Sequence, residues 1–152
     1  FYWVNDLVVS TKDADRIYAA TRTGVHISSD GGATWEHDLV ADQKGGCLDL
    51  AVRDNLTRDW LFASCGTLDQ ATGYRRRIQD GTAWEPVLSQ PGMGRTSLAV
   101  APSNQNIIYA LSASNVPGPG GRFEQALEQE ARHRRYRQSS LTHVPVALLH
   151  PS

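Results

Sequence analysis

Short apolar runs separated by polar turns follow one another along most of the chain. The runs are rich in β-branched and aromatic residues, a composition that favours β-strands over helices. The pattern predicts four strands in the first part of the sequence: Val4–Ser10, Arg16–Thr21, Gly24–Ser28 and Thr34–Val40.

The same strand pattern recurs further along the chain. Three segments, which begin at Asn5, Leu48 and Thr96, each contain an apolar strand, a polar turn and a second apolar strand. Their anchor residues lie 43 and 48 residues apart in the first strand and 44 and 47 apart in the second: Leu7, Leu50 and Leu98, then Tyr18, Phe62 and Tyr109. A repeat of this length with four strands is typical of a β-propeller blade.

The second repeat predicts strands in the same order as the first. Trp35 and Trp84 stand at the start of the two predicted fourth strands. The predicted strands of the second repeat are Cys47–Arg53, Trp60–Cys65, Tyr74–Ile78 and Ala83–Leu88.

The repeats predict an all-β chain, namely a β-propeller fragment of about two and a half four-stranded antiparallel blades. The predicted boundaries are 1–44 for the first blade, 45–92 for the second, 93–120 for half of a third, and 121–152 for an atypical tail. Because propellers usually close with four to eight blades, we expect a fragment of a larger protein that contributes the remaining blades. Phe1 in place of an initiator methionine agrees with this expectation.

The tail contains the charged sequence "FEQALEQEARHRRYRQSS". This sequence favours an irregular segment or a short charged helix; the alternative is that residues after Leu127 are foreign to the blade, through a frameshift or a truncated gene model. A run of charged residues such as this one more often forms a solvent-exposed face than a nucleic-acid site. The net charge of −1 gives the whole chain no electrostatic attraction to nucleic acid. No apolar run is long enough to span a bilayer.

One hairpin sequence, "SSDGGATW" from Ser28 to Trp35, resembles the Asp-box, or BNR repeat, whose pattern is Ser/Thr-x-Asp-x-Gly-x-Thr-Trp/Phe. The matching residues are Ser28, Asp30, Gly31, Gly32, Thr34 and Trp35. A degenerate copy keeps Asp80, Gly81 and Trp84. The resemblance implies a β-propeller; sialidases, xyloglucan-degrading glycosidases, sortilin-type receptors and a photosystem assembly factor all carry the motif.

The chemistry of the motif suits a structural turn better than a catalytic site. Asp30 can accept hydrogen bonds from backbone amides of its own turn, and the two adjacent glycines can adopt positive φ. The hydroxyl groups of Ser28 and Thr34 can close the loop. We expect the ring of Trp35 to be buried between two sheets.

The two cysteines of the chain, Cys47 and Cys65, face each other if the first two strands of the second blade pair around a turn near Leu56. They form either a cross-strand disulfide, with Cα atoms about 4.4–6.8 Å apart, or two buried free thiols. A disulfide would indicate an oxidising compartment, so we expect a secreted, periplasmic or cell-surface protein. Asn55 lies in an N-glycosylation sequon, which matters only in a eukaryotic secretory pathway.

Catalytic residues cannot be assigned from the sequence. Glycoside hydrolysis usually needs two carboxylates across a sugar, and nothing pairs the candidates Asp6, Asp42, Asp49 and Asp80. The chain does not match the arginine triad or the Arg-Ile-Pro motif of sialidases. In place of Arg-Ile-Pro it has "RIY" at Arg16 and "RIQ" at Arg77. We expect neither a metal nor a cofactor. The spacing of the five histidines does not match that of metal ligands; they are His26, His37, His133, His143 and His150.

The sequence therefore predicts a noncatalytic, extracytoplasmic propeller module that binds a protein or carbohydrate ligand. The alternative is a part of a glycoside hydrolase of the sialidase or xyloglucanase type, and an assembly factor is a third possibility. The fold resemblance alone does not choose among them.

Overall fold

A computed structural model describes residues 3–41, 45–54, 57–78 and 80–114 of the chain. The predicted tail over 121–152 lies outside the described residues. Within the described part there are ten strands and no helix, hence none that is long and apolar enough to cross a membrane. The strands are β1 (Val4–Val9), β2 (Ile17–Thr21), β3 (Gly24–Ser28), β4 (Glu36–Val40), β5 (Cys47–Arg53), β6 (Trp60–Gly66), β7 (Ala71–Arg77), β8 (Glu85–Leu88), β9 (Met93–Val100) and β10 (Ile108–Ser114).

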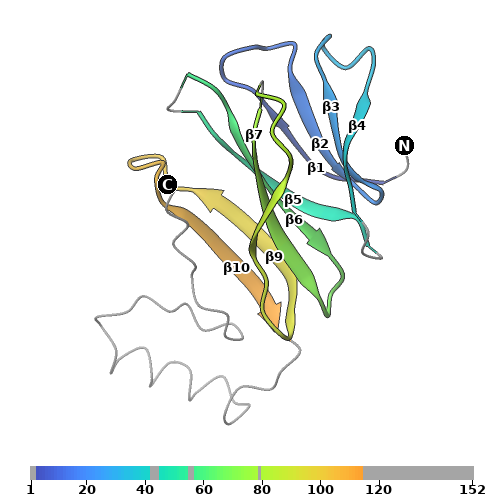
Figure 1. Ribbon diagram of the computed structural model, residues 1–152, viewed down its shortest axis with the longest axis vertical. Coiled ribbons are helices and arrows are strands. Elements are labelled where there is room, and N and C mark those ends of the chain that lie inside the picture. The colour runs from blue at the N-terminus through green and yellow to red at the C-terminus, as the bar shows by residue number, and fades with distance from the viewer. Residues whose placement is uncertain (1–2, 42–44, 55–56, 79, 115–152) are drawn as a thin grey trace.

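The strands form three antiparallel sheets in chain order. The first sheet contains β1 to β4, the second β5 to β8, and the third β9 and β10 (Figure 1). β5 contacts both β1 and β9, so the first strands of successive sheets lie beside one another. This arrangement confirms the predicted fold class, an all-β chain that forms part of a β-propeller.

The hydrophobic core lies between the faces of successive sheets. Tyr18 and Val25 of the first sheet pack with Leu50 and Leu61 of the second, and all four are buried. Because neighbouring residues of a strand point to opposite faces, Phe62 packs on the other side of the second sheet, in the cluster that contains Ile108. The second sheet is therefore covered on both faces.

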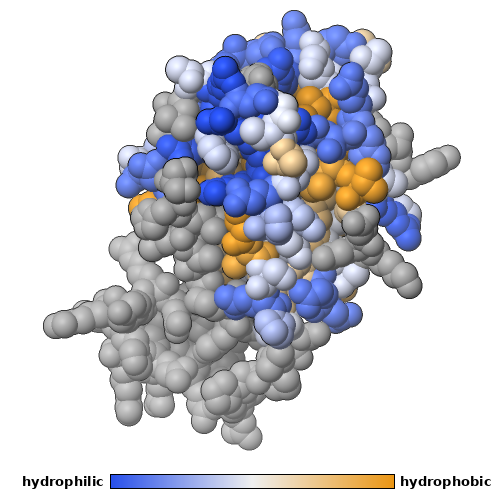
Figure 2. Space-filling model, viewed as in Figure 1, coloured by the Kyte–Doolittle hydropathy of each residue, from blue (hydrophilic) through white to orange (hydrophobic). Residues whose placement is uncertain are grey.

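The two outer sheets keep apolar side chains in solvent. Leu7 and Val9 on β1 are 51% and 42% exposed, and Tyr109 and Leu111 on β10 are each 43% exposed. Figure 2 shows hydrophobic residues near the middle of one face of the molecule, bordered by hydrophilic ones. Rows of such side chains on a sheet face are unusual in a complete soluble fold.

The fourth strands begin one residue after the tryptophans, at Glu36 and Glu85, and not at the predicted Thr34 and Ala83. In the first sheet the reason is local: the indole Nε1 of Trp35 donates a hydrogen bond to the carbonyl of Gly32 at 3.0 Å, which keeps the residue in the turn. The expected burial of Trp35 between sheets is wrong, since its half-buried ring lies over its own hairpin.

The third strand of the second sheet is longer than the prediction. It begins at Ala71, not at Tyr74, because it pairs with β6 along the whole of that strand, from Gly66 opposite Ala71 to Trp60 opposite Arg77.

Candidate functional site

The polar groups of the Ser28–Trp35 turn bond to one another. The Asp30 carboxylate accepts hydrogen bonds from the Ser28 hydroxyl at 2.8 Å, the Thr34 amide at 2.8 Å and the Thr34 hydroxyl at 2.6 Å. The Ser28 hydroxyl accepts the Gly32 amide at 2.9 Å. Gly31 and Gly32 have φ values of 69° and 93°, which side-chain-bearing residues rarely adopt. The turn is thus closed by its own side chains.

The electrostatics of Asp30 agree with a structural role. The hydrogen bonds from the Thr34 hydroxyl and amide, followed by that from Ser28, lower the pKa of Asp30 to about 2. A carboxylate that stays ionised and has its lone pairs occupied is a poor general acid at neutral pH. The β3–β4 loop also lies at an edge of the molecule, away from β9 (Figure 1).

The corresponding turn of the second sheet is held differently. Asp80 forms ion pairs with Arg58 and Arg77, and the Thr82 hydroxyl donates to the Arg77 carbonyl at 3.0 Å. Asp80 therefore links its hairpin to the segment before β6 as well as to the end of β7.

Trp84 joins the first sheet to the second. Its indole Nε1 donates to the Asp38 carboxylate on β4 at 2.7 Å, and Arg76 on β7 forms an ion pair with the same carboxylate. The ring packs against the core between these sheets. Of the two tryptophans that the sequence pairs, Trp84 is the one that contributes to sheet packing.

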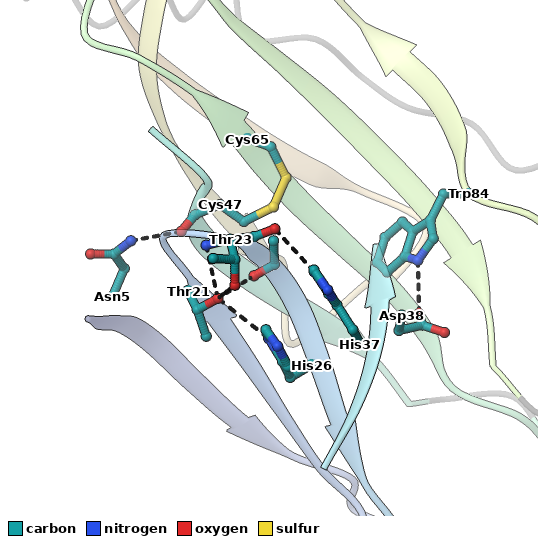
Figure 3. The surroundings of a disulfide bond; sticks show 10 residues. Asn5, Thr21, Thr23, His26, His37, Asp38, Cys47, Cys65 and Trp84 are labelled. Atoms are coloured by element: carbon teal, nitrogen blue, oxygen red, sulfur yellow. Dashed lines mark hydrogen bonds between the residues drawn. A yellow bond between two sulfur atoms is a disulfide. The ribbon is translucent and has the colours of Figure 1, made fainter. Parts of the chain in front are cut away.

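Cys47 and Cys65 are register partners on β5 and β6 and are joined by a disulfide (Figure 3). Their Cα atoms are 3.8 Å apart, closer than the expected range. The pairing register shifts between Cys47 and Asp49, so the bridge lies beside an irregularity of the β5–β6 pairing. Asn5 of the first sheet donates to the Cys47 carbonyl at 2.8 Å.

Two of the predicted carboxylates come together where the first strands of the sheets meet. The Asp6 carboxylate on β1 accepts the Leu50 amide of β5 at 2.8 Å, and the Asp49 carboxylate on β5 accepts the Leu98 amide of β9 at 3.2 Å. Asp6 and Asp49 are equivalent repeat positions, 43 residues apart. Each carboxylate therefore ties one sheet to the next in the same way.

The surroundings of Asp49 disfavour its charge. Burial, and to a lesser extent the neighbouring Asp6 carboxyl, raise the pKa of Asp49, while hydrogen bonds from Ser97 and Leu98 oppose this shift. Glycosidase carboxylates are held about 5–9.5 Å apart with a sugar or water between them. Asp6 and Asp49 instead hold backbone amides, so their geometry is that of a sheet-to-sheet link.

The remaining predicted residues do not join this pair. Asp80 forms ion pairs with Arg58 and Arg77, and Arg16 forms one with Asp13 at 3.5 Å. Asp42 and the sequon residue Asn55 lie outside the described residues.

Asp59 is a buried carboxylate that the sequence pattern did not indicate. This fully buried residue accepts the Tyr18 hydroxyl at 3.0 Å and lies 3.6 Å from the Lys12 ammonium group, so it connects two sheets. Burial, followed by the Asp59 charge, raises the pKa of Tyr18. The repeat carried no signal of this burial, since Asp15, which precedes Asp59 by 44 residues, is exposed.

Two histidines that the sequence left without a role lie stacked on the first sheet. The rings of His26 and His37 are parallel with centroids 4.3 Å apart, close to the disulfide in Figure 3. Burial, followed by the proximity of His37, lowers the pKa of His26. In the described part of the chain, no group of three or more acidic, histidine or cysteine side chains could hold a metal ion.

Two surface pockets are associated with the second sheet. One, of about 360 Å³, is lined by Gly45, Leu48, Gly66, Thr67, Leu68, Asp69 and Arg95. The other, of about 370 Å³, is lined by Thr57, Arg58, Trp60, Arg77 and Asp80. The first lies where β5 and β9 begin, and the second at the opposite ends of these strands.

Comparison with known proteins supports the fold. Neither a family model nor a curated protein sequence matches the chain. Among solved structures, the chain is similar to an ancestral GH74 enzyme, with a TM-score of 0.52 and 17% sequence identity. The similarity covers 74% of this chain and 16% of that enzyme.

Replacement of Asp30 with alanine should destabilise the protein, because the Thr34 and Ser28 donors lose their acceptor. The carboxylate has a lowered pKa when folded, so its stabilisation is present above the unfolded pKa and is lost as the pH falls toward about 2. Thermal melts should therefore show a lower melting temperature than wild type at neutral pH and a smaller difference in acid. Ser29→Ala, an exposed change in the same turn, is the control. An unchanged melting temperature would contradict the proposed bonding.

Replacement of Asp49 with asparagine tests the inner carboxyl pair. The folded protein favours protonated Asp49, so the stabilisation from that form is lost as the pH rises through the raised pKa. Asparagine keeps an acceptor for the Leu98 amide and adds a donor toward Asp6. The melting temperature of Asp49→Asn relative to wild type should therefore rise between about pH 3 and about pH 7. Glu36→Gln on the exposed end of β4 is the control; a difference that is constant with pH would refute the coupling.

The disulfide can be checked by peptide mapping without reductant, which should recover Cys47 and Cys65 in one cross-linked product. Reduction should lower the free energy of unfolding by about 2–4 kcal/mol, because the released chain gains entropy in the unfolded state. The double variant Cys47→Ser, Cys65→Ser should show the same loss and no response to reductant. Free thiols at both positions in oxidising buffer would exclude the bridge.

Proposed function

We propose that the chain is part of a glycoside hydrolase built on a β-propeller, to which it contributes blades. The observation that carries this proposal is the structural likeness to an ancestral GH74 enzyme over 74% of the chain. The chain spans about 16% of that enzyme's length, so the proposed activity is that of a larger protein.

In this proposal the Ser28–Trp35 turn is an Asp-box that stabilises a blade. Its support is the closed set of hydrogen bonds among Ser28, Asp30 and Thr34, which leaves the Asp30 carboxylate occupied. The turn around Asp80 is a degenerate copy, in which ion pairs with Arg58 and Arg77 replace the internal bonds.

Three carboxylates, those of Asp6, Asp30 and Asp49, are assigned to the scaffold. A glycosidase needs one carboxyl group that donates a proton and another that attacks or activates water. Asp6 and Asp49 accept backbone amides of the adjacent sheets, and Asp30 is bound in its turn. We therefore do not assign the catalytic pair to these three residues.

The outer sheet faces support the presence of further blades. Leu7 and Val9 lie on one outer sheet and Tyr109 and Leu111 on the other, all with more than two-fifths of their surface in solvent. Inside the structure, equivalent sheet faces are covered by a neighbouring sheet. A blade packed on each outer face would bury these side chains.

The Cys47–Cys65 disulfide supports a secreted, periplasmic or cell-surface location. Such bonds persist in oxidising compartments and are rare in the reducing cytosol.

A noncatalytic module that binds a protein or glycan is the second candidate. It is favoured by the same occupied carboxylates, since a binding protein needs no free acid pair. The two candidates differ in turnover and not in fold.

A comparison of the chain with the longest natural product that contains it tests the proposal. Both proteins would be assayed for reducing-sugar release from a panel of polysaccharides that includes xyloglucan, and for binding on a glycan array. The longer product should hydrolyse at least one glycan. In that product Asp6→Asn and Asp49→Asn should keep turnover, because these residues hold sheets together.

Glycan binding without hydrolysis by the longer product would favour the noncatalytic module. Loss of turnover in Asp6→Asn or Asp49→Asn, with unchanged melting temperature and glycan binding, would instead identify the inner carboxyl pair as catalytic.

A further inference from the structure

Residues of all three sheets lie at one end of the molecule. β1, β5 and β9 begin at this end, and the β2–β3 and β6–β7 turns return to it. A Cβ on Gly46 would lie 2.2 Å from the backbone of Arg22, and a Cβ on Gly94 would lie 1.8 Å from the Leu68 carbonyl. Backbone therefore packs directly on backbone at both sheet boundaries.

Trp3 stands at this end of the molecule, at the edge of the first sheet. Its side chain is 69% exposed, and its φ of 59° is unusual for a residue with a side chain. The Arg22 guanidinium lies 5.3 Å from the ring centroid, and the Arg22 amide donates to the Trp3 carbonyl at 3.2 Å. An exposed tryptophan held in a strained backbone conformation by a stacked arginine is a preorganised platform for a flat apolar surface.

The pocket of about 360 Å³ lies at the same end, toward the third sheet. Leu48 and Leu68 give it apolar walls, and Leu68 is 68% exposed. Asp69 and Arg95 add charge to its lining. Arg95 is exposed, and in the described part of the chain its guanidinium has no ion pair or hydrogen bond. We call the surface formed by Trp3, Arg22, Leu48, Leu68, Asp69 and Arg95 the end strip.

We propose that the end strip binds a chain of uronic-acid sugars, an inference that rests on the proposed function because that function makes the partner a glycan. A sugar ring has an apolar C–H face that fits Trp3, and a second ring fits between the leucines of the pocket. The carboxylate of a uronic acid matches the planar donor fork of Arg95, and the edge of the stacked Arg22 guanidinium offers another. Asp69 accepts hydrogen bonds from sugar hydroxyl groups.

Charge is the reason to prefer an acidic glycan over a neutral one. Two exposed arginines, one at each end of the strip, flank a single exposed aspartate. A neutral sugar would leave the Arg95 guanidinium without a bidentate acceptor, whereas a carboxylate would form a charge-assisted bidentate pair. The acid should therefore bind more tightly than its uncharged ester.

Isothermal titration calorimetry on the full chain tests the inference. The probes are trigalacturonate, a hyaluronan tetrasaccharide, and the methyl ester of trigalacturonate as an uncharged match. At least one acid should bind, and trigalacturonate, if it binds, should bind about tenfold more tightly than its ester, as expected for one charge-assisted pair. Arg95→Gln should remove most of the preference for acid, and Trp3→Ala should weaken acid and ester alike by about tenfold.

Matched controls separate these effects from general damage. Arg58→Gln changes an exposed arginine at the opposite end of the strands, and Tyr109→Ala removes a partly exposed aromatic ring on β10; both should leave affinity unchanged. Each variant should melt within a few degrees of wild type. Arg95→Lys, which keeps the charge but not the fork, should recover part of the acid preference.

Failure of this inference is distinguishable from failure of the proposed function. Three outcomes would overturn the end strip as a uronic-acid site. These are that neither acid binds, that acid and ester bind with equal affinity, or that Trp3→Ala or Arg95→Gln keeps full affinity for the acid. Hydrolysis of neutral glycans by the longer product would still support the proposed function in those cases. Binding of an acid without hydrolysis of any glycan would support the end strip as a uronic-acid site and contradict the proposed hydrolase function.

Discussion

The fold depends on how each sheet is tied to the next at its first strand. Asp6 reaches from β1 to the Leu50 amide of β5, and Asp49 reaches from β5 to the Leu98 amide of β9. Hydrophobic packing between sheet faces supplies most of the stabilisation but is not directional, so it tolerates sliding. A side-chain acceptor that must meet one particular amide fixes the relative height of adjacent sheets. Repetition of the same bond at the same repeat position makes the arrangement of three sheets regular.

The elements of this fold were largely predictable from the sequence, and the contacts between them were not. The repeat spacing and the apolar runs predicted both four-stranded sheets, because strand pairing within a blade is local in sequence. The meeting of Asp6 with Asp49 and the burial of Asp59 depend on how separate sheets stack, which the strand pattern does not encode. The position of Trp35 was mispredicted for a related reason: its hydrogen bond to Gly32 competes with burial between sheets, and only the turn geometry shows which prevails.

The two hairpin turns show how one motif can serve different contacts after small sequence changes. In the first, Asp30 satisfies the donors of its own turn, and the Gly31 amide donates to the Asp15 carbonyl before β2 at 2.9 Å. In the second, Asp80 binds arginines, and the turn tryptophan extends to Asp38 of the preceding sheet. The second hairpin has less internal bonding and more contact with its neighbour. Trp84 therefore couples this hairpin to the first sheet.

The two ends of the sheets meet different physical demands. At the end with the β3–β4 and β7–β8 hairpins, the polar side chains Asp30 and Asp80 are already bound within the chain. At the other end, backbone contacts at Gly46 and Gly94 join neighbouring sheets, and the Cys47–Cys65 bridge joins β5 to β6 within the second sheet; these contacts use little polar side-chain capacity. Side chains such as Trp3 and Arg95 are then left exposed on a rigid base. Rigidity without side-chain bonding is what a binding surface requires, because a ligand then meets donors that are positioned but not yet occupied.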